Sequence, residues 1–140
     1  MAVLTVFTAT FTPAGAAAGE ATPRDLALDV NGDLDLVDGD FRMLTGGEAI
    51  ASDLRARLQT WAGEHFLDTS LGVPWLSDVF GKAGAARAEQ VLRRTIEETP
   101  GVREILRFRL TVARTERTAA LDFAVSTDFG EIVVASQEGA

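Results

Sequence analysis

The sequence predicts an α+β fold in which two amphipathic helices pack on a small antiparallel sheet, with an N-terminal β-hairpin. Two segments, residues 45–63 and 85–99, repeat apolar residues every three or four positions, the period of a helix with one buried face. Three segments after residue 102 alternate apolar and polar residues, as half-buried strands do. Between two further alternating runs stands Asn31-Gly32, a pair that type I′ hairpin turns favour.

Composition and charge narrow the class of protein. With 140 residues, 46% of them hydrophobic, the chain can bury one core. It has no cysteine and a single histidine, His65, which argues against disulfides, thiolate nucleophiles and histidine-rich metal centres within one chain. The net charge of −8 disfavours nucleic-acid binding, and no long apolar run or basic leader marks a membrane span or a secretory signal. We expect a soluble, unexported protein with no cofactor, nucleic-acid partner or membrane partner.

The charge is distributed unevenly along the chain. Residues 1–80 carry 12 acidic and 4 basic side chains, whereas residues 81–140 carry 9 of each. Nearly all the basic residues are Arg, which either reflects genome composition or serves bidentate recognition at protein interfaces. An acidic front half and an Arg-bearing back half would suit head-to-tail assembly of several chains.

Composition divides the chain into two parts, residues 1–23 and residues 24–140. Within the first part, Val3 to Phe11 alternates in the manner of a strand, and Pro13 to Pro23 is an Ala/Gly-rich linker with nothing large to bury. This strand on its flexible arm either pairs with the sheet of its own chain or reaches a neighbouring subunit. Residues 24–140 are expected to form the single α+β domain.

The predicted hairpin places its apolar residues on one face of each strand and its Asp residues toward solvent. These apolar residues are Leu26, Leu28 and Val30 in the first strand, and Leu34 and Leu36 in the second. The same segment allows a calcium-binding interpretation, with EF-hand ligand positions filled by Asp29, Asn31, Asp33 and Asp40. The turn Gly stands two positions early for such a loop, and the last ligand is Asp instead of Glu. A calcium-dependent binding module stays an alternative.

Both predicted helices have identifiable ends. Thr45 and Glu48 have the spacing of a capping box, so the first helix should begin there and end near Gly63. Its apolar stripe is Ile50, Leu54, Leu58 and Trp61. The second helix should run from about Ala85 to Thr99, where Pro100-Gly101 ends it. Its stripe is Ala85, Ala88, Val91, Leu92, Thr95 and Ile96.

The C-terminal third predicts a three-stranded antiparallel meander. Its strands are centred on residues 103–112, 121–125 and 132–134, and Asp128-Phe-Gly supplies a turn. Arg107 and Arg109 form either a recognition face or the solvated side of an edge strand, where basic residues discourage aggregation. Together with a detachable N-terminal strand, the apolar run Ile132-Val133-Val134 provides the parts for β-augmentation, in which a partner's strand completes a sheet.

The segment between the helices, G-E-H-F-L-D-T-S-L-G-V-P-W from Gly63 to Trp75, is unusually rich in apolar residues for a connection. Because it contains Phe66, Leu67, Leu71 and Trp75, we expect it to be held against the core and shaped to position a partner.

The same segment also contains two carboxylates, Glu64 and Asp68, and a pair of carboxylates is what a glycosidase needs. A sugar cleft also needs aromatic and amide contacts, and the sequence has no Tyr and one Asn. A cell-wall-degrading, lysozyme-like enzyme stays an alternative, as does a free-standing regulatory adaptor.

Four strings, in this order, resemble one known family. They are the D-L-x-L-D-x-N-G-D hairpin with V-D-G-D, the T-G-G-E-A-I-A-S-D-L-R-x-R-L-x-T helix, the G-E-x-F-L-D-T-S-L-G-V-P-W loop, and E-E-T-P-G-V before the strands. From Asp25 to Val134 the chain resembles the baseplate-wedge, sheath-initiator proteins of contractile phage tails, including the Mu-like branch, which are related to contractile injection-system proteins. The arm before residue 24 is not part of this pattern.

The resemblance implies a non-enzymatic structural protein. A member of this family joins the baseplate wedge to the sheath and templates the first sheath ring by strand addition. The implied partners are the tail sheath protein and other baseplate wedge and hub proteins, with several copies per ring. The implied location is the virion tail baseplate, assembled in the host cytoplasm.

Two sources suggest residues for these contacts. Matching the family's helix and loop suggests Arg55, Arg57 and the loop residues, while the strand pattern adds the rest. The expected partner-binding residues are Arg55, Arg57, Gly63, Glu64, Leu71, Gly72, Val73, Pro74, Trp75, Arg107, Arg109, Ile132, Val133 and Val134. No catalytic or metal-binding residue is expected.

Overall fold

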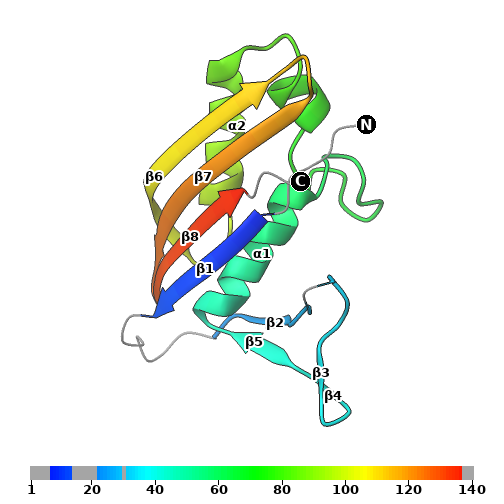
Figure 1. Ribbon diagram of the computed structural model, residues 1–140, viewed down its shortest axis with the longest axis vertical. Coiled ribbons are helices and arrows are strands. Elements are labelled where there is room, and N and C mark those ends of the chain that lie inside the picture. Colours follow the sequence, from blue (N-terminus) through cyan, green and yellow to red (C-terminus); the bar gives the residue numbers. More distant parts are fainter. Residues whose placement is uncertain (1–6, 14–21, 30, 137–140) are drawn as a thin grey trace.

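The structure has the predicted α+β architecture: one antiparallel sheet, two main helices and a small N-terminal hairpin region (Figure 1). It is a computed structural model that describes residues 7–13, 22–29 and 31–136. The elements are β1 (Phe7–Pro13), β2 (Arg24–Leu26), β3 (Leu36–Val37), β4 (Asp40–Phe41), β5 (Met43–Thr45), α1 (Gly47–Gln59), η1 (Trp75–Val79), α2 (Ala85–Glu97), β6 (Val102–Ala113), β7 (Thr118–Thr127) and β8 (Gly130–Ser136). No helix in the described ranges is long and apolar enough to cross a membrane.

The main sheet has the strand order β1-β8-β7-β6, with every neighbouring pair antiparallel. The predicted meander is therefore confirmed for β6, β7 and β8. The N-terminal strand adds to it, with Phe7 opposite Ser136 and Pro13 opposite Gly130, so the chain completes its own sheet. Val3 to Val6 and residues 14–21 of the predicted linker lie outside the described residues. Because β8 lies between β7 and β1, the C-terminal strand is not an edge.

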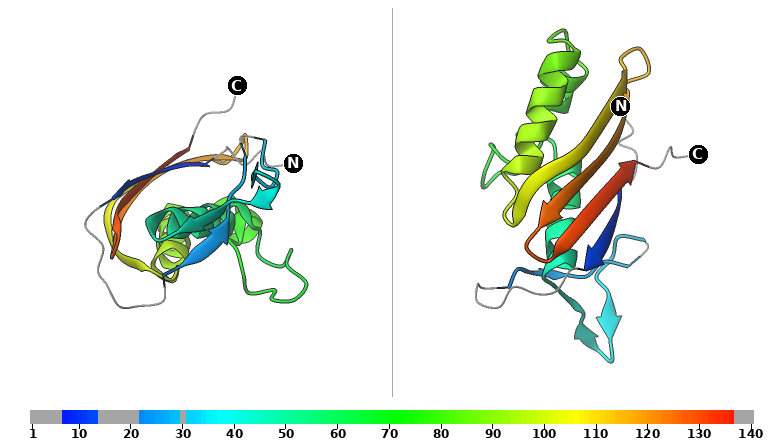
Figure 2. Two further views of the ribbon diagram at one scale, coloured as in Figure 1. Left: turned by 90° about the horizontal axis from the view of Figure 1, so that it is seen from below. Right: turned by 90° about the vertical axis from the view of Figure 1, so that its left-hand side faces the viewer.

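Both helices cover one face of the curved sheet, and the core lies between these two layers (Figure 2). From α1, the predicted stripe residues Ile50, Leu54 and Leu58 are fully buried, while Trp61, which lies beyond the helix, packs at the border of the core. From α2, Ala88, Leu92 and Ile96 are buried, whereas Ala85 is exposed. The sheet contributes Leu121, Phe123, Val125, Ile132 and Val134.

The start of α1 differs from the predicted capping box. Gly46 is the N-cap, no side chain caps the helix, and the Ile50 N–H donates to the Gly46 carbonyl at 3.1 Å. Thr45 belongs to β5 instead, because Gly46 adopts φ +60° and starts the helix one residue later. At Gly47 a Cβ atom would overlap the ring of Phe11, so the close approach of β1 to the helix start requires glycine.

The hairpin region, residues 24–45, is more open than predicted. β2 pairs with β5 and β3 with β4, while Leu28 and Leu34 form an isolated bridge. The turn is at Asn31-Gly32 as predicted, but it closes between Asp29 and Asp33, whose backbone atoms bond at 2.7 Å. Val30 lies outside the described residues. Ala27 is buried, but most of the large apolar side chains of this region stay exposed, since the hairpin projects beside the start of α1 (Figure 1).

The tight contact at Gly47 predicts an unusual effect of a Gly47→Ala substitution. In an open helix this change stabilises by up to about 1 kcal/mol, because Ala is the better helix former. Here the added methyl group displaces Phe11, and we expect a loss of about 1–3 kcal/mol in the free energy of unfolding, measured by urea denaturation.

The control for this prediction is the same substitution in a Phe11→Ala background. With the ring removed, Gly47→Ala should become neutral or stabilising. Equal destabilisation in both backgrounds would show that the ring is not the cause.

Candidate functional site

The loop of residues 63–72 is closed at its base by backbone pairing. Trp61 and Val73 form a parallel bridge, in which the Ala62 N–H donates to the Val73 carbonyl and the Val73 N–H donates to the Thr60 carbonyl, both at 2.9 Å. Val73 is fully buried. The loop is therefore a closed projection and not a loose connection.

Trp75 anchors the C-terminal side of the loop. Its ring is 1% exposed, and its Nε1–H donates to the Leu58 carbonyl at 3.0 Å. Leu58 lies in the last turn of α1, where carbonyl groups lack partners within the helix, so the indole satisfies a buried acceptor. Pro74 precedes this residue at the start of η1, a single π-helical turn. The prediction that Trp75 pins the loop to the core is confirmed.

Two glycines and one carboxylate shape the base of the loop. Gly63 and Gly72 have φ values of +91° and +93°, which favour glycine, and a Cβ at Gly72 would also meet the Thr60 carbonyl. Oε2 of Glu64 accepts a hydrogen bond from the Trp61 N–H at 3.1 Å. Glu64 therefore helps to close the loop that it belongs to.

The tip of the loop is not held against the core as predicted. Phe66 is 86% exposed and Leu67 is 76% exposed, while Leu71 is half-buried. Phe66 stacks only on the neighbouring His65, with ring centroids 6.2 Å apart. The prediction was wrong because Val73 and Trp75 already fill the space at the base, which leaves the tip in solvent. An aromatic and an aliphatic side chain side by side in solvent are typical of a protein contact.

The carboxylates of the loop do not have the environment of a glycosidase pair. Asp68 accepts hydrogen bonds from the Ser70 hydroxyl at 2.5 Å and the Ser70 N–H at 3.0 Å. These two bonds, helped by the charge of His65, lower the pKa of Asp68 from its ordinary value. A general acid needs a raised pKa, so this shift has the wrong direction for that role. Glu64, the other member of the pair, is bonded to the backbone instead.

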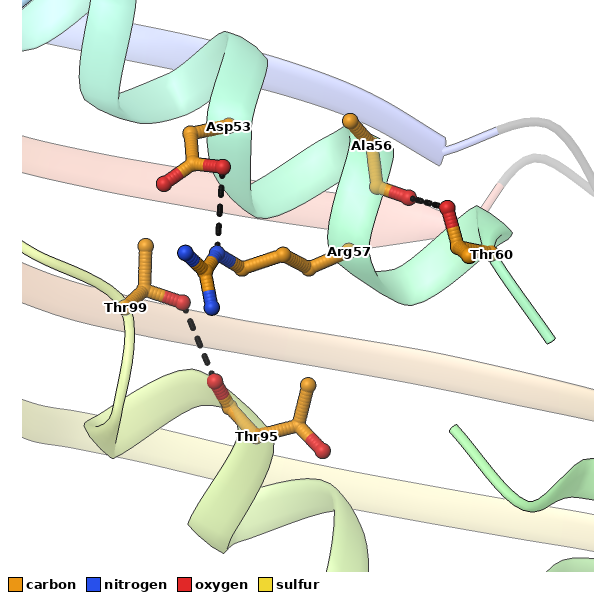
Figure 3. A network of polar contacts seen from close by, with 6 residues as sticks. All are labelled: Asp53, Ala56, Arg57, Thr60, Thr95 and Thr99. Atoms are coloured by element: carbon orange, nitrogen blue, oxygen red, sulfur yellow. Dashed lines mark hydrogen bonds and ion pairs between the residues drawn. The ribbon is translucent and has the colours of Figure 1, made fainter. Parts of the chain in front are cut away.

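The two arginines of α1 have different surroundings. Nε of Arg57 donates to Oδ1 of Asp53 at 3.0 Å within the helix (Figure 3). Arg57 is thus held by an ion pair within its own helix. Arg55 instead lines a surface groove, described below.

The predicted strand residues fall on opposite faces of the sheet. Ile132 and Val134 are fully buried beneath the helices, so they hold the core together. Arg107, Arg109 and Val133 lie on the outer face, where they line a shallow hollow with Asp122, the residue paired with Arg109. The structure brings the two arginines and Val133 together, but it separates them from the loop.

One feature was missed by sequence reasoning: a groove between the hairpin region and α1. The residues that line this hairpin groove are Phe11, Asp25, Leu26, Leu28, Leu34, Leu44, Glu48, Ala51, Ser52, Arg55, Ala56 and Gln59. The alternation of apolar and polar residues had identified Leu26, Leu28 and Leu34, and it had predicted that the face of the hairpin that carries them is buried. It did not show that the face would stay open.

The calcium interpretation of the hairpin gains no support from the geometry. Oδ1 of Asp29 accepts hydrogen bonds from the N–H groups of Asn31 at 2.8 Å and Asp33 at 3.0 Å, so the carboxylate shapes the turn. Among the described residues, no group of three or more His, Cys, Asp or Glu side chains is placed to hold a metal ion.

Comparison with protein families decides what this domain is. The model of the contractile injection system sheath initiator family matches residues 24–130. The chain belongs to this family. A search of curated proteins finds no match. Sheath initiators are structural components of the baseplate and tail, which agrees with a non-enzymatic domain that contacts sheath and baseplate. The match begins at the first residue of β2 and ends at the first residue of β8.

The Trp75 anchor of the sheath initiator predicts a large stability effect for Trp75→Phe. The smaller ring leaves a gap and removes the donor for the buried Leu58 carbonyl, so we expect a loss of about 2–4 kcal/mol in urea denaturation. Phe66→Ala removes an aromatic side chain from the same loop and should change stability by less than about 0.5 kcal/mol, because that side chain is exposed. Similar losses for both variants would contradict this division between base and tip.

The Asp29 turn predicts a pH effect confined to the hairpin. Hydrogen bonds from the N–H groups of Asp33 and Asn31 lower the pKa of Asp29 below its ordinary value of 3.8. The turn is therefore stabilised above that pH and loses the stabilisation as pH falls through the lowered pKa. In NMR titrations, the amide signal of Asn31 should shift with a midpoint below 3.8, and this transition should be lost in Asp29→Asn. A midpoint at the ordinary value would contradict the role of these bonds.

Proposed function

We propose that this sheath initiator joins the baseplate wedge to the sheath and templates the first sheath ring by accepting a strand of the tail sheath protein at the free edge of β6. The observation that carries the proposal is the strand order. Among the described elements, β1 and β6 are the two edges of the main sheet, and β6 is the longer of them, with 12 residues against seven. From Arg107 to Ala113 its register with β7 is unbroken, so this half presents a regular row of backbone donors and acceptors.

The geometry moves the proposed template from the last strand to β6. Ile132, Val133 and Val134 belong to β8, whose two sides are already paired with β7 and β1. A partner strand can reach β8 only if β1 leaves, which breaks seven residue pairings and withdraws Phe11 from the core border. Addition at β6 requires no such loss.

The arginines beside the β6 edge are consistent with an edge strand that pairs with a selected partner strand only. Arg107 and Arg109 are exposed on the outer face of β6, and Leu106 is 51% exposed next to them. Basic side chains on an edge discourage indiscriminate pairing, while an acidic partner strand would meet them favourably. In this proposal they select the sheath strand.

In this proposal, the tip of the loop of residues 63–72 makes a second contact, with other wedge or hub proteins of the baseplate. The loop projects from the helical side of the molecule, away from β6 (Figures 1 and 2). Phe66 and Leu67 offer exposed apolar contacts on a base that Trp75 holds rigid. Several copies, placed around a ring in the baseplate of a phage tail assembled in the host cytoplasm, would then present several β6 edges to the sheath.

The test uses two variants mixed with the sheath subunit encoded in the same genome, with co-sedimentation and negative-stain images as readouts. Thr10→Cys/Val133→Cys places cysteines opposite each other on β1 and β8 in a chain without other cysteines, so oxidation locks β1 in place. Arg107→Glu/Arg109→Glu reverses the charge beside the β6 edge. The oxidised, locked variant should still nucleate ordered sheath rings, and the charge-reversed variant should lose most of its activity.

Opposite outcomes would identify a different strand acceptor. If the locked variant nucleates only after reduction, β1 must leave and β8 accepts the sheath strand. If wild type binds no sheath protein, the sheath contact itself fails. Truncation after Thr127 is unsuitable, because it removes Ile132 and Val134 from the core.

A further inference from the structure

Exposed apolar side chains concentrate in the hairpin region. Among the described residues, seven of the eleven exposed large hydrophobic side chains lie between Leu26 and Met43. They are Leu26, Leu28, Leu34, Leu36, Val37, Phe41 and Met43. Proteins that act alone rarely leave so much apolar surface in one region, so this segment has the composition of an interface.

Three of these leucines form one wall of the hairpin groove. Leu26, Leu28 and Leu34 are 38–47% exposed there, and α1 lines the groove with three small residues and three longer polar ones. The small residues are Ala51, Ser52 and Ala56, and the longer ones are Glu48, Arg55 and Gln59. The groove has a volume of about 550 Å³ and is open to solvent. The leucines and the small side chains of α1 together leave room for large apolar side chains from another chain.

The charge around the groove is negative. The hairpin region, residues 24–45, contains six Asp and two Arg, and one of these arginines, Arg42, is paired with Asp35 at 3.0 Å. At the groove itself, Asp25 and Glu48 provide two carboxylates against the single Arg55. A segment that entered this groove would therefore gain from positive charge beside its apolar anchors.

We propose that the hairpin groove binds a segment of a neighbouring protein that carries aliphatic or aromatic anchors flanked by Lys or Arg. The occupant is a peptide segment because the groove lies along α1, the arrangement in which amphipathic segments dock by a few spaced anchors. This contact goes beyond the proposed function. It uses neither β6 nor the loop tip, so it stands or falls separately from sheath nucleation.

The test is a selection from a random 16-residue peptide display library on the purified full-length protein. Peptides that bind should be rich in large apolar residues and carry net positive charge. Their affinity, measured by fluorescence anisotropy, should fall at least about tenfold for Leu34→Asp and for Ala56→Arg, which blocks the opposite wall. Binding should also weaken as salt is raised from about 0.05 to 0.5 M.

The matched control is Leu36→Asp, at a leucine of the same hairpin that is 58% exposed, against 46% for Leu34, and that does not line the groove. It should leave peptide affinity within about twofold of wild type. Circular dichroism melting checks that each variant is folded. The proposal is overturned if no peptide is enriched, if the peptides carry no positive charge, or if Leu36→Asp weakens binding as much as Leu34→Asp. Sheath-ring nucleation by Leu34→Asp, assayed in parallel, separates failure of this proposal from failure of the proposed function.

Discussion

The burial of one face of the sheet under α1 and α2 is the constraint on which the rest of the structure depends. Phe123, Leu121 and Val125 of the central strand β7 are fully covered, and both helices direct their apolar stripes at them. Each helix has 13 residues, too few for stable helix formation alone, so helix and sheet depend on this shared core. The outer face is free of that demand and carries Arg107, Arg109 and small residues instead.

Two close contacts attach the peripheral segments to this core. Gly47 lets the ring of Phe11 approach the start of α1, which joins β1 to the helix that the hairpin leads into. Trp75 holds the end of α1 and the loop base together through the Leu58 carbonyl. Both contacts lie at the ends of α1. At its C-terminal end, a backbone carbonyl needs a partner from outside the helix. At its N-terminal end, the close approach of Phe11 requires a glycine. The hairpin and the loop are therefore positioned by the two ends of one helix.

The sequence was sufficient to predict the helices and strands whose hydrophobic pattern repeats within a short segment. The stripe of α2 and the meander of β6, β7 and β8 followed from periodicity, because burial on one face imposes that period directly. The capping box failed because Gly46 adopts a positive φ, which places Thr45 in a strand. The sequence did not decide whether β1 pairs with β8 of its own chain or with a neighbouring subunit. A strand that is joined to the domain by a flexible linker can do either.

For the candidate site, the sequence did not show which of the apolar side chains are buried. Trp75 lies in the core, as expected of a large apolar residue that helps to hold the loop, while its contact with a partner stays a prediction. Phe66 and Leu67 were misplaced because composition shows how much apolar surface exists, and not how much space remains to cover it. The same holds for the hairpin leucines, whose alternation predicted a buried face although the described residues cover it only in part.

The surfaces left uncovered lie on three different elements, which bears on how a baseplate component assembles. The β6 edge offers backbone pairing, the loop tip offers two apolar side chains, and the hairpin groove offers leucines within negative charge. Since these surfaces differ in chemistry, each discriminates against the partners of the others. In the proposed assembly, each partner that binds only the folded domain would also add to its stability, so that one contact would strengthen the sheet on which the next contact depends.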